Sequence, residues 1–327
     1  MRKERLELSR LSAPAPKAGA STNSATFAVR IAKPESIAEI AQPRHGNNRL
    51  AASEKAFLVA VNHYENFPVA SWLAPAPLRS AIVAIYAFAR GADDIADEGD
   101  AAASARLEQL DFYERMLDAI ERGEDPREPP FAALCVAIRE HALPFTPFRQ
   151  LLSAFRQDVV KSRYASFVEL SEYCSRSANP IGRLLLHLYG IDSGDERARS
   201  DAICTGLQLA NFWQDIAIDR DKGRLYLPAE DLQRFGVSEQ QIDGGTCDER
   251  WQRLLAFEVG RTRALLEAGR PLTRALPLRL SLELKAVIEG GLRILRAIDL
   301  AQGDVFRRRP KLSRRDWAAI SLAAVLR

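Results

Sequence analysis

Apolar residues recur every three or four positions along most of the chain from about residue 50 onward. This spacing places them on one face of an α-helix, and we find no stretch with the apolar–polar alternation of a half-buried strand. Proline and glycine separate the periodic stretches. The helices that the pattern predicts are 51–66, 77–97, 101–122, 130–141, 147–161, 167–175, 178–190, 195–219, 229–235, 248–268, 281–301 and 313–326. Helices of this number joined by short loops predict an all-α bundle around a central apolar cavity.

The two ends of the chain differ from this helical part. Residues 1–48 are rich in Ala, Ser, Pro and Asn with little periodicity, which predicts a disordered tail, with a transit-like segment as the alternative. Residues 49–302 form the predicted folded domain. Residues 303–327 carry the basic run 307–311 before a terminal helix, and we interpret this run as a solvated or membrane-surface tail rather than a nucleic-acid patch.

Composition and charge exclude several classes of protein. Hydrophobic residues make up 47% of the 327 positions, which is enough for a large core, and the net charge of +3 is too small to indicate a nucleic-acid partner. No apolar run reaches the ~20 residues that span a bilayer, and the start of the chain lacks the apolar stretch of a secretory signal. The four cysteines are far apart, as expected for reduced thiols. We expect a cytoplasmic protein, and a lipid substrate would require peripheral contact at the inner membrane surface.

The first candidate for chemistry is a pair of aspartates on the predicted helix 77–97. Asp93 and Asp97 are four residues apart and therefore share one helix face. That face continues backwards through Ala89, Tyr86 and Ile82, which form an apolar stripe rather than a solvated surface. Two buried carboxylates one turn apart repel each other, so a cation between them would stabilise the arrangement.

The second candidate is a ladder of oxygen-bearing side chains on the predicted helix 195–219. Asn211, Asp215 and Asp219 follow one another at four-residue steps. Their neighbours are strongly apolar, namely Leu207, Leu209, Phe212, Trp213, Ile216 and Ile218. Two such ladders on apolar helices are difficult to explain as solvated faces. Carboxylate and amide oxygens suit Mg²⁺, which completes its coordination with water and phosphate oxygens.

Other signals are weaker or absent. The chain has no P-loop, no Gly-x-Gly-x-x-Gly turn and no Gly-x-Ser-x-Gly elbow, so a Rossmann NADPH site is not expected. Asp158, Lys161 and Arg163 form a polar cluster that is either a solvated helix end or a part of the site.

The chain resembles the squalene/phytoene synthase family over roughly residues 50–300. The resemblance rests on both aspartate motifs in order, on Tyr86-Ala87-Phe88-Ala89-Arg90 before the first, on Tyr173-Cys174 between them, and on Asp221-Lys222-Gly223-Arg224-Leu225-Tyr226-Leu227-Pro228 after the second. It implies an all-α isoprenoid synthase fold in which the two motifs face each other across a cavity and bind an isoprenoid diphosphate through Mg²⁺.

Within the family, the sequence is most similar to the branch that forms hydroxysqualene in bacterial hopanoid biosynthesis. The stretches that carry this likeness are Asn62-His63-Tyr64-Glu65-Asn66-Phe67-Pro68-Val69-Ala70-Ser71, Ser177-Ala178-Asn179-Pro180-Ile181-Gly182 and Asn211-Phe212-Trp213-Gln214-Asp215. Condensing members of the family carry Ser-Lys-Ser-Phe at 64–67, Ala-Gly-Thr-Val-Gly at 178–182 and usually Arg at Gln214. Two cationic phosphate contacts are therefore missing, as expected for an enzyme that ionises one preformed substrate.

The resemblance implies a lyase that ionises presqualene diphosphate and captures the carbocation with water to give hydroxysqualene. The alternatives are a condensing squalene or phytoene synthase, which is a transferase, and a non-catalytic helical assembly factor. Pathway enzymes are conceivable partners. Implied site residues are Tyr86, Tyr173 and His63 for catalysis, Arg90, Gln208, Arg224 and Tyr226 for the diphosphate, and Asp93, Asp97, Asn211, Asp215 and Asp219 for the metal. Phe67, Phe88, Phe212 and Trp213 are candidates for the walls of a carbocation pocket.

Overall fold

The computed structural model describes residues 74–326, and within this range every regular element is a helix. In chain order the elements are α3 (Ala76–Asp97), α4 (Ala103–Glu121), α5 (Phe131–His141), α6 (Phe145–Val160), α7 (Phe167–Ser177), α8 (Asn179–Leu188), α9 (Gly194–Asp221), α10 (Ala229–Phe235), α11 (Glu239–Asp243), α12 (Glu249–Gly269), the 3-10 helix η2 (Arg270–Arg274), α13 (Leu278–Leu300) and α14 (Arg314–Leu326). The predicted all-α fold is confirmed. The predicted helix 51–66 and the predicted tail 1–48 lie outside the described residues.

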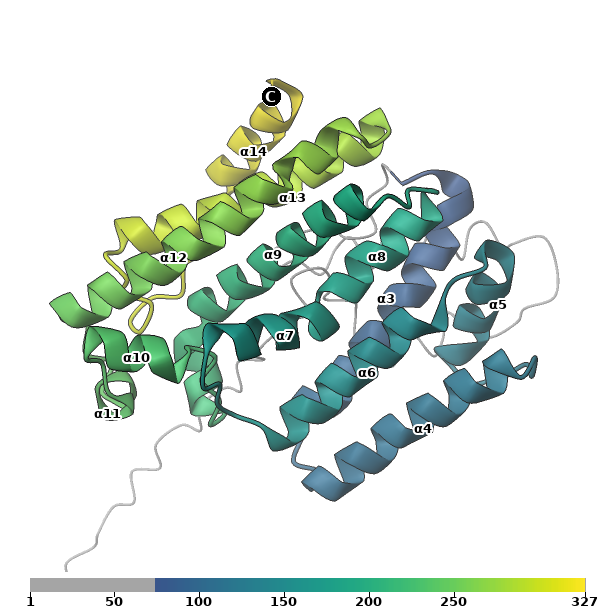
Figure 1. Ribbon diagram of the computed structural model, residues 1–327, viewed down its shortest axis with the longest axis horizontal. Helices are drawn as coiled ribbons and strands as arrows, with labels where there is room; N and C mark the ends of the chain where they lie inside the picture. Colours follow the sequence, from purple (N-terminus) through teal and green to yellow (C-terminus); the bar gives the residue numbers. More distant parts are fainter. Residues whose placement is uncertain (1–73, 327) are drawn as a thin grey trace, which may run out of the picture.

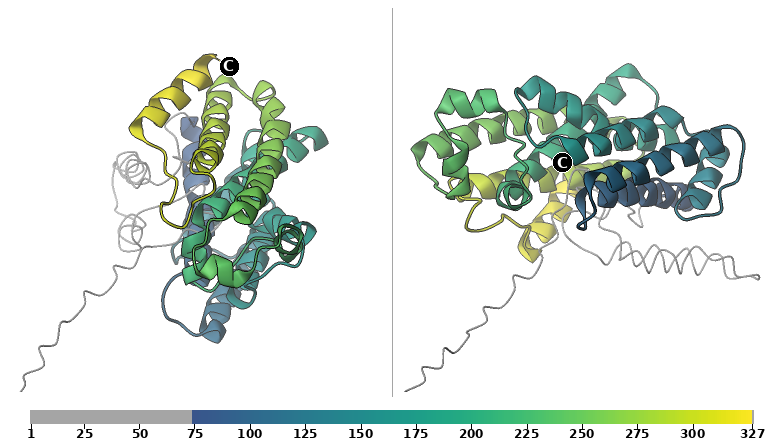
Figure 2. Two further views of the ribbon diagram at one scale, coloured as in Figure 1. Left: turned by 90° about the vertical axis from the view of Figure 1, so that its left-hand side faces the viewer. Right: turned by 90° about the horizontal axis from the view of Figure 1, so that it is seen from below.

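The helices are arranged around α9, which runs through the middle of the molecule (Figure 1). Helices α12 and α13 pack on one side of α9, and α8 packs on another side. Helices α4, α5 and α6 cover α3, and Figure 2 shows the same grouping from two further directions. Each acidic helix therefore has its own core: α3 belongs to the apolar cluster of α3–α6 and α8, and α9 to the cluster of α7 and α9–α13.

Local sequence signals fix both ends of α9. The side chain of Ser193 accepts a hydrogen bond from the backbone N–H of Glu196 at 3.2 Å, which caps the first turn. At the other end Gly223 has a φ of 76°, which favours glycine, and the backbone N–H of Arg224 donates to the carbonyl oxygen of Asp219 at 2.8 Å. This turn reverses the chain directly after the second acidic motif.

The segment after α9 then pairs with the loop between α6 and α7. The backbone N–H of Leu225 donates to the carbonyl oxygen of Ser162 at 3.0 Å, and that of Ala229 donates to the carbonyl oxygen of Tyr164 at 2.9 Å. These bonds fix Arg224 and Tyr226 next to α6 and α7. No helix within residues 74–326 is long and apolar enough to cross a membrane.

A buried acidic group lies away from both acidic motifs, between α10 and α12. Glu258 is fully buried, and Arg261 donates to Glu258 at 3.2 Å and to Asp231 at 2.9 Å. The Arg261 guanidinium also lies 3.9 Å from the centre of the Phe167 ring. Burial raises the pKa of Glu258 to about 8, although Arg261 favours the charged carboxylate.

We expect a Glu258→Gln variant to gain stability relative to the wild type as the pH rises. The folded protein keeps the Glu258 proton up to about pH 8, whereas the unfolded chain releases it near pH 4.5, so this group lowers wild-type stability progressively between these values. A neutral glutamine has no proton to lose, and its advantage should reach about 2–4 kcal/mol at alkaline pH. Urea unfolding of both proteins across this pH range measures the difference.

The matched control is Glu121→Gln, which removes a half-exposed carboxylate that pairs with Arg149 at 2.7 Å. Its stability relative to the wild type should not rise with pH. A Glu258→Gln variant that follows the same pH curve as this control would contradict the assignment.

Candidate active site

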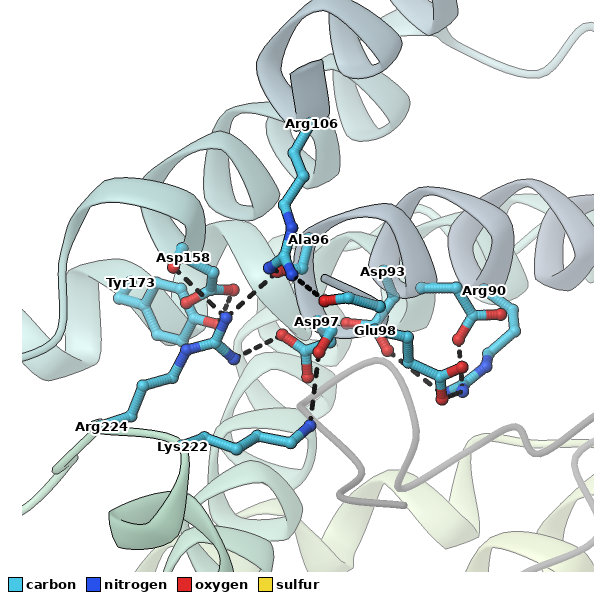
Figure 3. Close-up of polar contacts among 12 residues, drawn as sticks. Arg90, Asp93, Ala96, Asp97, Glu98, Arg106, Asp158, Tyr173, Lys222 and Arg224 are labelled. Carbon is cyan, nitrogen blue, oxygen red and sulfur yellow. Dashed lines mark hydrogen bonds and ion pairs between the residues drawn. The ribbon is translucent and has the colours of Figure 1, made fainter. Parts of the chain in front are cut away.

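The first acidic motif lies at the C-terminal end of α3 and is buried. Asp93 and Asp97 lie on the same helix face, as their spacing predicts, and both side chains are almost inaccessible to solvent. Arg90 pairs with Asp93 at 3.3 Å, with Asp94, and with Glu98 at 3.1 Å (Figure 3). Arg90 therefore neutralises part of the negative charge at this helix end.

Negative charge still exceeds positive charge around these carboxylates. Burial raises the pKa of Asp93 well above its ordinary value, and the neighbouring Asp97 raises it further, while Arg90 opposes both effects. Burial also raises the pKa of Asp94 to about 6, again against Arg90. The C-terminal end of a helix carries partial negative charge of its own. An additional cation at this position would therefore be stabilised.

Arg224 connects the end of α3 to the segment after α9. Its guanidinium pairs with Asp97 and donates to the carbonyl oxygens of Ala96 at 3.1 Å and Asp158 at 3.3 Å. Lys222 approaches the carbonyl oxygen of Asp97 at 3.4 Å (Figure 3). The two acidic motifs are distant in sequence, and these cationic side chains bring their helix ends together.

The second acidic motif lies in the C-terminal half of α9. Gln208, Asn211, Asp215 and Asp219 are all buried. Both polar atoms of the Gln208 amide are buried without a hydrogen-bond partner among residues 74–326, so this amide is available to a ligand. The site therefore combines buried carboxylates with a buried amide that has donor and acceptor capacity left over.

Arg309 reaches the second motif from the C-terminal segment, and sequence reasoning missed it. Its guanidinium forms a two-pronged ion pair with Asp215, with Nη2 to Oδ2 at 3.1 Å, and its side chain is 14% exposed. The neighbouring Gln214 donates to the carbonyl oxygen of Pro310. The interpretation of 307–311 as a solvated tail is therefore wrong for Arg309. Separation by 94 residues left no local sequence signal for this contact.

Tyrosines gather around Asp158, one member of the polar cluster 158–163. The Tyr173 hydroxyl donates to Asp158 Oδ2 at 2.6 Å. The Tyr226 ring stacks on Phe212 with ring centres 3.7 Å apart and planes 7° apart. Burial raises the pKa of Asp158 to about 7, against Arg224 and the tyrosine hydrogen bonds. Asp158 thus belongs to the site, whereas Lys161 pairs with Glu169 outside it.

Comparison with known proteins agrees with this geometry. Residues 60–316 match the model of the squalene/phytoene synthase family. The chain belongs to the squalene/phytoene synthase family. It is therefore a member of a family of enzymes of isoprenoid biosynthesis, whose substrates are isoprenoid diphosphates.

Relatives within the squalene/phytoene synthase family carry different activities. The chain is 38% identical to a hydroxysqualene synthase of Rhodopseudomonas palustris over 236 residues, which cover 72% of this chain and 79% of the relative. It is 34% identical to a 15-cis-phytoene synthase of Synechocystis sp. over 260 residues, which cover 75% of this chain and 77% of the relative. Membership of the family therefore does not identify the reaction of this chain, and the residues of the site must distinguish between the alternatives.

Two solved structures support the fold. The squalene synthase HpnC from Alicyclobacillus acidocaldarius matches with a TM-score of 0.71 and 38% identity, covering 79% of this chain and 97% of that one. A dehydrosqualene synthase in complex with a ligand matches with a TM-score of 0.74 at 23% identity, covering 84% of this chain and 97% of that one. The second match concerns the fold alone.

The donor set fits the Mg²⁺ that the family resemblance implies, although side chains would have to move. Buried carboxylate and amide oxygens on α3 and α9 are the ligands that Mg²⁺ prefers. Within residues 74–326, however, no three His, Cys, Asp or Glu side chains are grouped closely enough to hold a metal ion. Arginines pair with Asp97 and Asp215 instead. A metal ion would therefore have to compete with Arg309 for Asp215.

Some predicted site residues lie apart from this centre. Tyr86 is buried earlier on α3, where burial and the neighbouring Cys204 and Glu283 raise its pKa. Phe88 packs against Phe148 in the core of α3 and α6, with ring centres 5.3 Å apart. The indole N–H of Trp213 donates to Thr262 of α12 at 2.7 Å. Phe88 therefore packs in the core of α3 and α6, whereas Trp213 lines a hollow together with Phe212, Asp219 and Tyr226. Their assignment to the walls of a carbocation pocket stays a prediction. His63 and Phe67 lie outside the described residues.

We expect Arg309→Ala to destabilise the metal-free protein and to strengthen its binding of divalent metal. Removing one partner of a buried ion pair leaves Asp215 with less compensation, at a cost of about 2–4 kcal/mol. A metal ion would then no longer have to displace the guanidinium. Thermal unfolding and Mn²⁺ titration followed by electron paramagnetic resonance measure the two effects.

Arg307→Ala is the matched control, because it removes the same charge from the same segment. The Arg307 side chain is 82% exposed and pairs with Asp304 at 3.2 Å. This variant should keep wild-type stability and metal affinity. If the two variants behave alike, the competition between Arg309 and metal is refuted.

Proposed function

We propose that this enzyme ionises presqualene diphosphate and captures the resulting carbocation with water, giving hydroxysqualene and diphosphate. The observation that carries the proposal is the environment of Gln214. Condensing members of the family usually carry arginine at this position, where it would add a cation for a second diphosphate. Here the buried Gln214 amide donates to the carbonyl oxygen of Pro310. One substrate with one diphosphate fits this arrangement better than two.

A second departure from the condensing pattern lies at the start of α8. Asn179 is buried, and its side-chain oxygen accepts a hydrogen bond from Thr205 of α9 at 3.0 Å. The stretch Asn179-Pro180 thus anchors α8 to α9. The 38% identity to a hydroxysqualene synthase supports the same assignment.

In this proposal the acidic side chains bind the metal ion and the arginines bind the diphosphate. Asp93, Asp97, Asn211, Asp215 and Asp219 would hold Mg²⁺, which neutralises the charge that develops on the leaving diphosphate. Arg90, Arg224 and the Gln208 amide would orient the diphosphate, with charge-assisted hydrogen bonds from the two arginines.

The hydrocarbon cation needs a different environment, one of aromatic faces. The stacked Phe212 and Tyr226 rings lie directly beside the second acidic motif. Contact of a cation with such a face is worth about 0.5–2 kcal/mol. We propose that these rings stabilise the carbocation close to the diphosphate that has just left it.

The alternative is a condensing phytoene or squalene synthase, supported by the 34% identity to a phytoene synthase. Purified protein incubated with Mg²⁺ and farnesyl, geranylgeranyl or presqualene diphosphate, without NADPH, separates the two. Hydroxysqualene from presqualene diphosphate is the expected product. Formation of presqualene diphosphate or dehydrosqualene from farnesyl diphosphate, or of phytoene from geranylgeranyl diphosphate, would reject the proposal.

We expect Asp93→Asn to lower kcat/KM for presqualene diphosphate by about 100- to 1000-fold, because a group that stabilises developing charge is lost. Thermal stability should not fall, because the amide keeps the shape and removes one of several crowded negative charges. Steady-state release of diphosphate and thermal unfolding are the measurements. This variant also tests a third possibility, a non-catalytic assembly factor, which predicts no turnover by either protein.

Asp118→Asn on α4 is the control for the substitution itself. Its side chain is exposed and pairs with Arg149 at 2.7 Å, so turnover should stay at the wild-type level. Wild-type turnover by Asp93→Asn would remove the first acidic motif from the mechanism.

A further inference from the structure

A pocket of about 720 Å³ lies where α12 ends, η2 follows and α13 begins, and we call it the η2–α13 pocket. Ser281, Lys285 and Glu289 line it at four-residue steps, so they share one face of α13. The short helix η2 contributes Arg270 and Arg274. The volume is typical of a small-molecule site, and no residue of either acidic motif is part of its lining.

Arg270 holds the walls of the η2–α13 pocket together. Its guanidinium pairs with Glu267 of α12 at 2.6 Å and with Glu289 of α13 at 3.0 Å. The hydroxyl of Thr273 donates to the carbonyl oxygen of Arg270 at 2.9 Å. These bonds connect α12, η2 and α13, so the pocket is part of the folded scaffold and its two carboxylates have a counter-charge.

Two further cations line the η2–α13 pocket without a counter-charge. Within residues 74–326 neither Arg274 nor Lys285 forms an ion pair. The lining as a whole thus contains three basic and two acidic side chains. The first turn of α13 has no acidic residue, and Pro277 before it offers no side-chain cap. The positive end of this helix therefore adds to an excess of positive charge that favours an anion.

The side chain of Ser281 is an independent sign of a polar ligand. Ser281 is only 6% exposed, and it lines the η2–α13 pocket. Its hydroxyl has no hydrogen-bond partner in the part of the chain that the structure describes, whereas buried hydroxyls nearly always have one. A hydroxyl can donate to an anion. Ser281 lies one helical turn before Lys285, so both can donate to the same group.

The rim of the η2–α13 pocket is apolar. Leu278 lines the pocket and is 73% exposed, although it begins α13. Pro271 and Leu276 are also part of the lining. Cations and a donor hydroxyl beside an exposed leucine suit a molecule with an anionic head and an apolar chain.

We propose that the η2–α13 pocket is a second anion site, which binds a phosphate group through Arg274, Lys285 and Ser281. The phosphate comes from a free phosphate compound or from the headgroup of a lipid, whose apolar chain would contact Leu278. The proposal goes beyond the proposed function and is independent of it, because no residue of the candidate active site takes part.

Calorimetric titration of the full-length protein with inorganic phosphate, at constant ionic strength and with EDTA, tests the phosphate contact. Without a divalent metal the crowded carboxylates of the acidic motifs repel phosphate, so binding should report on the η2–α13 pocket. We expect Arg274→Ala and Lys285→Ala each to weaken binding by about 5- to 10-fold, because a charge-assisted hydrogen bond is lost. Ser281→Ala should weaken it by about 3- to 5-fold.

Arg279→Ala is the matched control, because it removes the same charge from the same turn of α13. Arg279 is exposed and is not part of the pocket lining. This variant should bind phosphate as the wild type does. Circular dichroism of every variant measures whether its helices are intact, and the exposed Arg274 is the substitution least able to disturb them.

Co-sedimentation with vesicles distinguishes the two sources of the phosphate. The vesicles contain phosphatidylcholine alone or an equimolar mixture with phosphatidylglycerol, which is anionic. Sedimentation with the mixture that Arg274→Ala, Lys285→Ala and Leu278→Ser each reduce assigns the phosphate to a lipid headgroup, and Leu278→Ser should then keep its affinity for inorganic phosphate. Phosphate binding without sedimentation assigns it to a free phosphate compound.

Two results would overturn the proposal. The first is a wild-type protein that binds neither inorganic phosphate nor the anionic vesicles. The second is binding that Arg274→Ala and Lys285→Ala change no more than Arg279→Ala does, since the contact would then depend on net charge and not on the η2–α13 pocket.

Discussion

Burying several carboxylates on two helices is costly, and compensation of this charge governs the arrangement of the rest of the site. Asp97 on α3 and Asp215 on α9 are both inaccessible to solvent, and each is paired with an arginine from a different segment. A buried carboxylate without a counter-charge destabilises a fold by several kcal/mol. The turn after α9 and the C-terminal segment must therefore pack where Arg224 and Arg309 reach these groups. Charge compensation thus joins two separate apolar cores into one site.

Local patterns in the sequence were sufficient to predict most of the helices and part of the candidate site. The three- and four-residue spacing predicts α3 and α9 closely, because it reflects burial on one helix face. Only α11 and η2 escaped prediction among the described elements, since five residues are too few to show a period. The same spacing placed Asp93 and Asp97 on one face. The contact of Arg309 could not be predicted, because Arg309 lies between α13 and α14 and its partner Asp215 on α9 is 94 residues earlier in the chain.

The C-terminal segment supplies the positive charge that pairs with Asp215 of α9. Gln214 occupies a position at which condensing relatives usually carry arginine, and its amide holds Pro310 by a hydrogen bond. The adjacent Arg309 then pairs with Asp215, one residue further along α9. The hydrogen bond from Gln214 and the ion pair of Arg309 thus both attach the C-terminal segment to α9. The cation beside the second motif is therefore carried by a connecting segment and not by α9.

Two aspartates that share Arg224 have different surroundings although their side chains are the same. Asp97 receives the guanidinium on its carboxylate, and this ion pair supplies a counter-charge to the buried group. Asp158 receives it on the backbone oxygen, and tyrosine hydroxyls face its carboxyl group instead. Burial then raises the pKa of Asp158 to about 7, where a carboxyl group can exchange protons. The two groups therefore differ in their electrostatic surroundings, because the guanidinium pairs with the carboxylate of Asp97 but with the backbone oxygen of Asp158.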